Sequence, residues 1–226
     1  MVWQKKRKGL FRNYCEMKGI FKFKHWQKTS TNKIQKIIKN KKVIGVIGAS
    51  RKMGVTHICL CIANFLQSAL KQNVLYIELA EDSQLLPVVG EKQINFDGHI
   101  AFSYKKVTYV LACDEEEAVS LINSWNGHIV IDVADYSKNS YQVLCRCDKK
   151  IMIGSLQPWC IKDVEMMIEK LKGDGLMEKF IYTYENDTDT KPSGNPLGCA
   201  IRTRPFIENP LKLKEEDFNA IVEMIL

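Results

Sequence analysis

The stretch that most constrains the fold is residues 41–66, KKVIGVIGASRKMGVTHICLCIANFL. It begins with a short apolar run typical of a buried strand and passes through a loop that contains Gly48 and Gly54. It then continues as an almost wholly apolar run, which is typical of a helix packed on a sheet. The N–H groups at the start of such a helix favour an anion. This order of elements therefore predicts a phosphate-binding turn.

Strands and helices alternate after this stretch. The helix near 114–125 begins with Asp114 and three glutamates, which favours a helix N-terminus. Residues 99–112 are predicted to form a hairpin at the sheet edge, around a Lys-Lys turn. This alternation predicts an α/β fold with a doubly wound, mostly parallel sheet and helices on both faces. The expected strands are 43–47, 73–79, 127–137, 148–156, 179–187 and 199–206, and the expected helices are 56–70, 114–125, 161–175 and 214–226.

Positive charge is concentrated at one end of the chain. Residues 1–42 hold 14 Lys and Arg against one acid, Glu16, whereas residues 43–226 hold 19 Lys and Arg against 25 acids. We therefore divide the chain into a basic N-terminal arm, 1–42, and an α/β domain, 43–226. Aromatic residues are interleaved with the charges of the arm: Trp3, Phe11, Tyr14, Phe21, Phe23 and Trp26.

The arm could bind one of several partners. Apolar residues recur at helical spacing (Leu10, Tyr14, Met17 and Phe21), which predicts a short amphipathic helix. Such a segment, within residues 1–30, could lie on an anionic membrane surface, dock onto a protein partner or contact DNA. A solvated tail remains the alternative. No apolar run of the chain approaches the roughly 18 residues of a membrane span.

The eight cysteines and four histidines of the chain show no spacing typical of a metal site. Two C-x-C pairs occur, Cys59/Cys61 and Cys145/Cys147, without a histidine at ligand spacing. Cysteine used as a small apolar residue in a reducing compartment accounts for this pattern. We expect no structural metal and a cytoplasmic location, with the arm placing the protein at the inner face of a membrane.

One interpretation of the loop is a dinucleotide site. GASRKMG resembles the GASRGIG loop of short-chain dehydrogenases, and Glu78, 24 residues after Gly54, would be the ribose-binding acid. These enzymes also need Tyr and Lys four residues apart downstream of the loop. The only such pair here is Tyr14/Lys18, which lies upstream in the arm. An NAD(P)-binding Rossmann protein is therefore the less favoured interpretation.

The other interpretation is a P-loop. The order of several motifs resembles the MinD/ParA branch of P-loop ATPases, which includes the TadZ/CpaE pilus-assembly proteins, and the resemblance covers most of 43–226. The family loop K-G-G-x-G-K-[ST] falls on residues 50–56, where Gly54 and Thr56 match the last glycine and the Mg²⁺-binding hydroxyl residue. The strand HIVIDVAD is similar to the Walker B strand, which implies that Asp132 lies near the Mg²⁺ ion.

The departures from the family pattern concern its catalytic residues. The phosphate-binding lysine is replaced by Val55, and the lysine that begins the family loop is replaced by Ser50. The family's second strand ends D-x-D, and Ala80 stands at its second Asp, which positions the attacking water. Phosphoryl transfer depends on positioned charge, so we expect no hydrolysis and assign no catalytic residue. Arg51 and Lys52 nevertheless bring two positive charges to the loop.

The resemblance implies a degenerate P-loop protein, a pseudo-ATPase that works as a scaffold, localisation or regulatory factor. It implies ATP or ADP with Mg²⁺ as the ligand, a homodimer, and Mg²⁺ held near Thr56 and Asp132. Three alternatives stay open: a loop that only connects strand to helix and binds no nucleotide, an active ATPase that uses Lys52 or Arg51 in place of the missing lysine, and a DNA-associated regulator. The predicted nucleotide-binding residues are Gly48, Ser50, Arg51, Lys52, Met53, Gly54, Val55, Thr56 and His57.

Overall fold

The computed structural model describes residues 37, 40–133, 136–176, 180–184 and 201–226. Most of the predicted basic arm, including its amphipathic helix, lies outside the described residues. Two of its residues do contact the domain. Ile37 is buried in the core, and the Lys41 ammonium donates to the carbonyls of Ile122 and Trp125 at 2.8 and 2.7 Å. The division at residue 42 stays a prediction.

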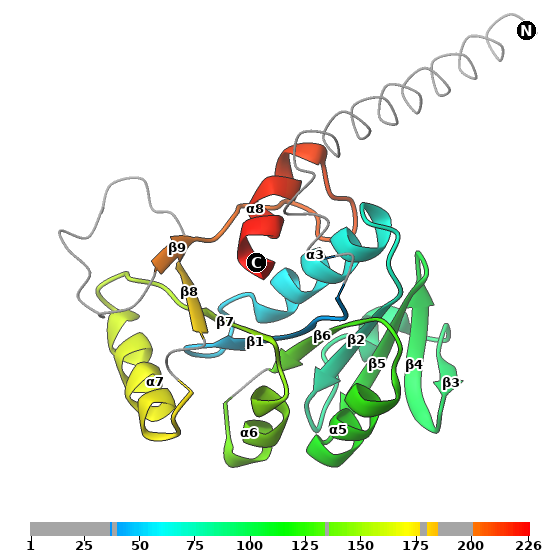
Figure 1. Ribbon diagram of the computed structural model, residues 1–226, viewed down its shortest axis with the longest axis horizontal. Helices are drawn as coiled ribbons and strands as arrows, with labels where there is room; N and C mark the ends of the chain where they lie inside the picture. Colours follow the sequence, from blue (N-terminus) through cyan, green and yellow to red (C-terminus); the bar gives the residue numbers. More distant parts are fainter. Residues whose placement is uncertain (1–36, 38–39, 134–135, 177–179, 185–200) are drawn as a thin grey trace, which may run out of the picture.

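The described strands form one nine-stranded sheet in the order β3-β4-β5-β2-β6-β1-β7-β8-β9 (Figure 1). The seven strands from β5 to β9 pair in parallel, and β3 and β4 add antiparallel strands at one edge. The doubly wound, mostly parallel fold predicted from the sequence is thereby confirmed. The strands are β1 Val43–Gly48, β2 Val74–Leu79, β3 Ile94–Phe96, β4 His99–Tyr104, β5 Val107–Cys113, β6 His128–Val133, β7 Lys149–Ile153, β8 Phe180–Tyr184 and β9 Ile201–Thr203.

Helices cover both faces of the sheet. In Figure 1, α3 and α8 lie on one face, and α5, α6 and α7 lie on the other. Asp114 caps α5 as predicted, because its side chain accepts from Glu117 N while Glu117 accepts from Asp114 N. The described helices are α3 Val55–Ser68, α4 Leu86–Val89, α5 Glu115–Ser124, α6 Lys138–Cys145, α7 Ile161–Gly173 and α8 Glu215–Ile225.

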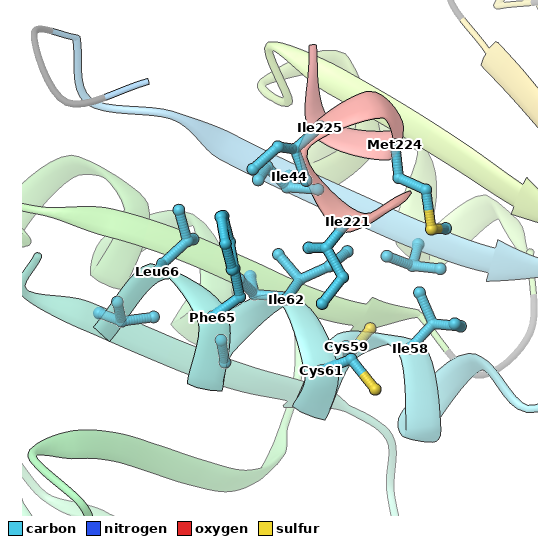
Figure 2. Packing of buried hydrophobic residues seen from close by; sticks show 14 of the residues in the cluster. Ile44, Ile58, Cys59, Cys61, Ile62, Phe65, Leu66, Ile221, Met224 and Ile225 are labelled. Atoms are coloured by element: carbon cyan, nitrogen blue, oxygen red, sulfur yellow. The ribbon is translucent and has the colours of Figure 1, made fainter. Parts of the chain in front are cut away.

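Helix α3 is buried nearly all round, as its apolar sequence predicts. One side packs on the sheet, and α8 covers the other, so that Ile221 and Ile225 lie near Ile62 and Ile44 (Figure 2). The rings of Phe65 and Phe218 meet with centroids 5.3 Å apart. A helix enclosed in this way holds its N-terminus in one place relative to the strand ends.

The predicted hairpin at 99–112 is formed by β4 and β5, and its Lys105–Lys106 turn has positive φ at both residues. The prediction that this hairpin forms the sheet edge was incomplete, because β3 lies outside β4. The β3–β4 connection is Asp97-Gly98, again with positive φ at both positions, which the tight turn of a hairpin requires. Helix α6 was also not predicted.

None of the helices within the described ranges combines the length and the apolar composition that a membrane crossing needs.

Candidate nucleotide-binding site

The loop between β1 and α3 is tightly closed. Its first residue, Ala49, donates its N–H to the Ile153 carbonyl at 2.8 Å, which joins the loop to the end of β7. A Cβ at Gly48 would lie 2.7 Å from the Ser50 carbonyl oxygen, so only glycine fits there. Gly54 precedes α3 with φ 82° and ψ 27°, a left-handed conformation that favours glycine. The two glycines that the sequence singled out therefore shape the loop.

Val55 packs in the apolar core. Its side chain is 8% exposed and belongs to the core beneath the loop. A Cβ added to Gly48 would lie 3.1 Å from a Val55 methyl group. The position of the family lysine is therefore filled by an apolar contact, and it supplies no positive charge to the loop.

A cation does reach the loop from another part of the chain. Arg204, which follows β9, is half-buried and donates from Nη1 to the Met53 carbonyl at 2.6 Å. The same nitrogen lies 2.6 Å from the place of a Cβ on Gly54. The predicted cations Arg51 and Lys52 are both exposed at the turn of the loop, and Lys52 has φ 64°. Three cationic side chains therefore belong to this loop region.

Arg204 was not predicted from the sequence as a site residue because it lies 151 residues away from Met53. One signal was available. Arg204 comes directly after a parallel strand, β9, and the carboxyl ends of parallel strands share the edge of the sheet where ligands bind.

The predicted metal ligands Thr56 and Asp132 do come together. Thr56 lies in the first turn of α3, and Asp132 lies on β6 with 2% of its surface exposed. Burial raises the pKa of the Asp132 carboxyl to about 6, against the lowering effect of hydrogen bonds with Thr56 and Tyr76. The Tyr76 hydroxyl donates to Oδ2 at 2.7 Å. The other oxygen, Oδ1, is buried without a hydrogen-bond partner, which suits a carboxylate adjacent to a cation site.

A second buried carboxylate stands beside Asp132. Glu78 on β2 is in register with Asp132 on β6, and it too is 2% exposed. Its Oε1 accepts from Gln84 N at 2.8 Å, while Oε2 has no hydrogen-bond partner. Proximity to Glu78 raises the pKa of Asp132 further. Glu78 and Asp132 therefore form a pair of buried carboxylates on neighbouring strands, each with one oxygen that has no hydrogen-bond partner.

Ala80 stands directly after β2, where the P-loop interpretation expects an acid, and the acids that follow it, Glu81 and Asp82, are exposed. Ala80 is half-buried, and its N–H donates to the Cys113 carbonyl at 3.2 Å. A methyl side chain cannot orient or activate a water molecule, so position 80 lacks the group that the P-loop interpretation assigns to hydrolysis.

His57 joins the loop to the C-terminal segment. Its Nε2 lies 2.8 Å from the Ile207 carbonyl. An open pocket of about 540 Å³ lies here, lined by Gly54 and His57 on one side and by the segment 203–207 on the other. Phe206 in that segment is 90% exposed. An exposed ring beside a basic loop provides an apolar surface on which a planar group could stack.

Comparison with known proteins gives a result only at the level of structure. No protein-family model and no curated protein matches the sequence. MinD from Pyrococcus horikoshii OT3, complexed with Mg-ADP, matches 82% of this chain and 95% of its own, with a TM-score of 0.59 and 12% identity. The fold is that of the MinD and ParA ATPases.

Other solved structures with the MinD/ParA fold agree. A ParA family ATPase from Chlorobium tepidum TLS has a TM-score of 0.59 at 11% identity, covering 82% of this chain and 91% of that one. Apo McdA from Cyanthece has a TM-score of 0.56 at 13% identity, covering 82% and 98%. Identities this low establish the fold and leave the roles of individual residues to the geometry of this site.

Proposed function

We propose that this protein binds an adenine nucleotide with Mg²⁺ without hydrolysing it, and that it acts as a scaffold or localisation factor. The observation that carries the proposal is the contrast within one site. Thr56 and Asp132, the predicted cation ligands, are hydrogen-bonded to each other, whereas Val55 and Ala80 stand at the positions of the two groups that phosphoryl transfer needs. Two structures with this fold are a MinD complexed with Mg-ADP and a Borrelia burgdorferi plasmid partition protein bound to AMPPNP.

Nucleotide phosphates would lie at the N-terminus of α3. The positive end of the helix dipole and the N–H groups of its first turn attract anions. The guanidinium groups of Arg51 and Arg204, together with the Lys52 ammonium, supply the positive charge that Val55 does not. Arginine binds phosphate oxygens through two parallel hydrogen bonds, so it can replace a lysine in binding.

The basic arm would provide attachment. Trp3, Phe11 and Trp26 are amphipathic or apolar groups among lysines, the composition of a segment that lies at an anionic membrane surface. A homodimer is part of the same proposal. The experiment should delete residues 1–30 only, because Ile37 is buried in the core and a longer deletion would damage the domain. Vesicles with and without acidic lipid, and a DNA duplex at several salt concentrations, then separate membrane attachment from DNA binding.

The test of the nucleotide proposal is calorimetric titration of the protein with ATP, ADP and a non-hydrolysable ATP analogue, with and without Mg²⁺, beside a phosphate-release assay. We expect Mg²⁺-dependent binding and no phosphate release. Thr56→Val removes the hydroxyl and keeps the shape, so it should abolish the effect of Mg²⁺. Thr108→Val, the same change on β5, should leave binding unchanged.

Two results would contradict the proposal. Turnover of ATP would establish an active ATPase, and Lys52 and Arg51, both exposed at the loop, would then be the first residues to mutate. Absence of binding up to millimolar nucleotide would mean that the loop only connects β1 to α3.

A further inference from the structure

A cluster of three side chains that can bind a metal lies near the antiparallel edge of the sheet, where β3, β4 and β5 are. His99 begins β4, Cys113 ends β5, and Glu117 lies in the first turn of α5. The ligand atoms of the three side chains all lie within 4.8 Å of one another. Within the described part of the chain, this is the one group of three such residues close enough to share an ion.

Local backbone geometry directs Cys113 into the cluster. The pairing of β2 with β5 shifts register between Ile77 and Leu79, which is where a bulge places an extra residue in β5. Ala112 has φ 51°, a left-handed conformation that a residue with a Cβ rarely adopts. A bulge of this kind re-aims the side chain that follows it. Cys113 is accordingly buried at 1% exposure.

Glu117 is held by the cap of α5. Its Oε2 accepts from Asp114 N at 3.0 Å, so this oxygen is fixed by the backbone. Its Oε1 lies 3.4 Å from Nδ1 of His99. One carboxylate oxygen is therefore anchored and the other faces the imidazole, the arrangement in which an outer hydrogen bond orients a metal ligand. The side chains of His99 and Glu117 are 17% and 41% exposed, which leaves a path for an ion.

We propose that His99, Cys113 and Glu117 bind one divalent transition-metal ion of the zinc type, separately from the nucleotide site. One nitrogen, one sulfur and one carboxylate oxygen form a ligand set suited to zinc, which often takes three protein ligands and a water molecule. Ligand atoms around a tetrahedral zinc lie roughly 3.5 Å apart, so an approach of about an ångström by side chains completes the site.

The proton balance of binding is simple. The Cys113 thiol loses its proton to solvent and binds as a thiolate. The imidazole of His99 carries its remaining hydrogen on the nitrogen that does not bind the metal. The +2 charge of the ion is then balanced by the thiolate and the carboxylate, so the buried part of the site is neutral, which lowers the cost of burial.

Metal binding would also act on the neighbouring strand. The Cys113 carbonyl accepts from Ala80 N, so the residue that binds the ion also ends the hydrogen bonding of β2. An ion at Cys113 would thus fix β4, β5 and α5 together at the end of the strand that carries Glu78. Sequence spacing did not predict this site because His99 and Cys113 are the first and last residues of a hairpin, which only the pairing of β4 with β5 brings together, and Glu117 lies on a helix.

The test is titration of the full-length, reduced and metal-depleted protein with Co²⁺, followed by absorption spectroscopy and then competition with Zn²⁺. We expect one Co²⁺ per chain, with a thiolate-to-cobalt charge-transfer band that Zn²⁺ removes. Cys113→Ser should abolish the band. Cys160→Ser, which changes a half-buried cysteine before α7, should keep it.

A second variant distinguishes the loss of a metal ligand from misfolding. Glu117→Gln keeps an acceptor for Asp114 N, so the capping box and the fold are retained while the charged ligand is lost. It should weaken Co²⁺ binding at least tenfold and leave the melting temperature of the metal-depleted protein unchanged. The proposal is overturned if the wild-type protein gives no band, if the band survives in Cys113→Ser, or if Glu117→Gln binds Co²⁺ as tightly as the wild type.

Discussion

The enclosed middle of α3 and the exposed loop at its N-terminus differ in their roles: the first contributes to the core, and the second carries the candidate binding site. From Ile58 to Leu66 the helix is enclosed by the sheet and α8, and its side chains make the core (Figure 2). At its N-terminus the chain is exposed at Arg51 and Lys52 and folded around two glycines. The enclosed part fixes the position of the exposed part. Mutations in the first region should therefore reduce stability, and mutations in the second should reduce ligand binding.

The strongest effect is expected from Phe65→Ala. Phe65 is fully buried and packs on Phe218, so the change removes a large side chain and leaves a cavity between α3 and α8. We expect a loss of about 3–5 kcal/mol in the free energy of unfolding, measured by denaturant titration. Met166→Ala at a 60% exposed position on α7 is the control, with a change within about 0.5 kcal/mol. An equal loss in both variants would contradict the structural division.

Asp132→Asn should change how stability depends on pH. The pKa of Asp132 is raised to about 6 in the folded protein, so the folded state binds this proton more tightly than the unfolded state does. The wild type therefore loses stability through this group as pH rises from about 4 to 6, by up to about 3 kcal/mol. Asparagine cannot ionise, so the variant should lack this loss. If the free energy of unfolding depended on pH in the same way in both proteins, the raised pKa of Asp132 would be contradicted.

Gly54→Ala tests the loop itself. A left-handed conformation costs roughly 1–2 kcal/mol for a residue with a Cβ, and the new atom would lie 2.6 Å from Nη1 of Arg204. We expect a loss of that size in the free energy of unfolding, together with weaker nucleotide binding. Gly173→Ala at the end of α7 meets no atom within 4 Å and should cost nothing. A stable Gly54→Ala protein with unchanged affinity would show that Arg204 is not needed at the loop.

The smallest effect on stability is expected from Arg204→Ala. Its hydrogen bond to the Met53 carbonyl is half-buried, so the free energy of unfolding should fall by about 1 kcal/mol. Nucleotide affinity should fall by about tenfold, since the change removes a cation from the loop. Arg202→Ala, whose side chain binds the Glu223 carbonyl, is the matched control with unchanged affinity. Equal affinity losses in both variants would indicate a general charge effect.

The parts of the fold predicted from sequence are those with a local signal. Apolar runs predicted the central strands and α3, and Asp114 with the three glutamates that follow it predicted the start of α5. Strand β3 was missed although the Asp97-Gly98 turn that follows it is typical of a hairpin, because β3 itself is only three residues long. Helix α6 was missed because it is only eight residues long and its sequence, KNSYQVLC, contains few apolar residues.

The site was predictable only where its residues follow adjacent strands. Thr56 and Asp132 come together because β1 and β6 are neighbours in the sheet, as their order in the family pattern implied. Arg204 reaches the loop from the segment after β9, 151 residues away along the chain, and no local pattern records that. His99, Cys113 and Glu117 meet through a hairpin, a bulge and a cap, each a tertiary consequence of the others.

The distance of 151 residues between Met53 and Arg204 has a consequence during synthesis. At 5–20 residues per second, a ribosome needs roughly 8–30 seconds to proceed from the loop to Arg204. For most of that interval α3 has already been made, while α8, which covers its outer side, has not. Helix α3, which carries the site at its N-terminus, thus exposes an apolar face on the nascent chain. Chaperone occupancy of ribosome-bound chains should accordingly rise after α3 emerges and stay high for as long as α8 is not available to cover it.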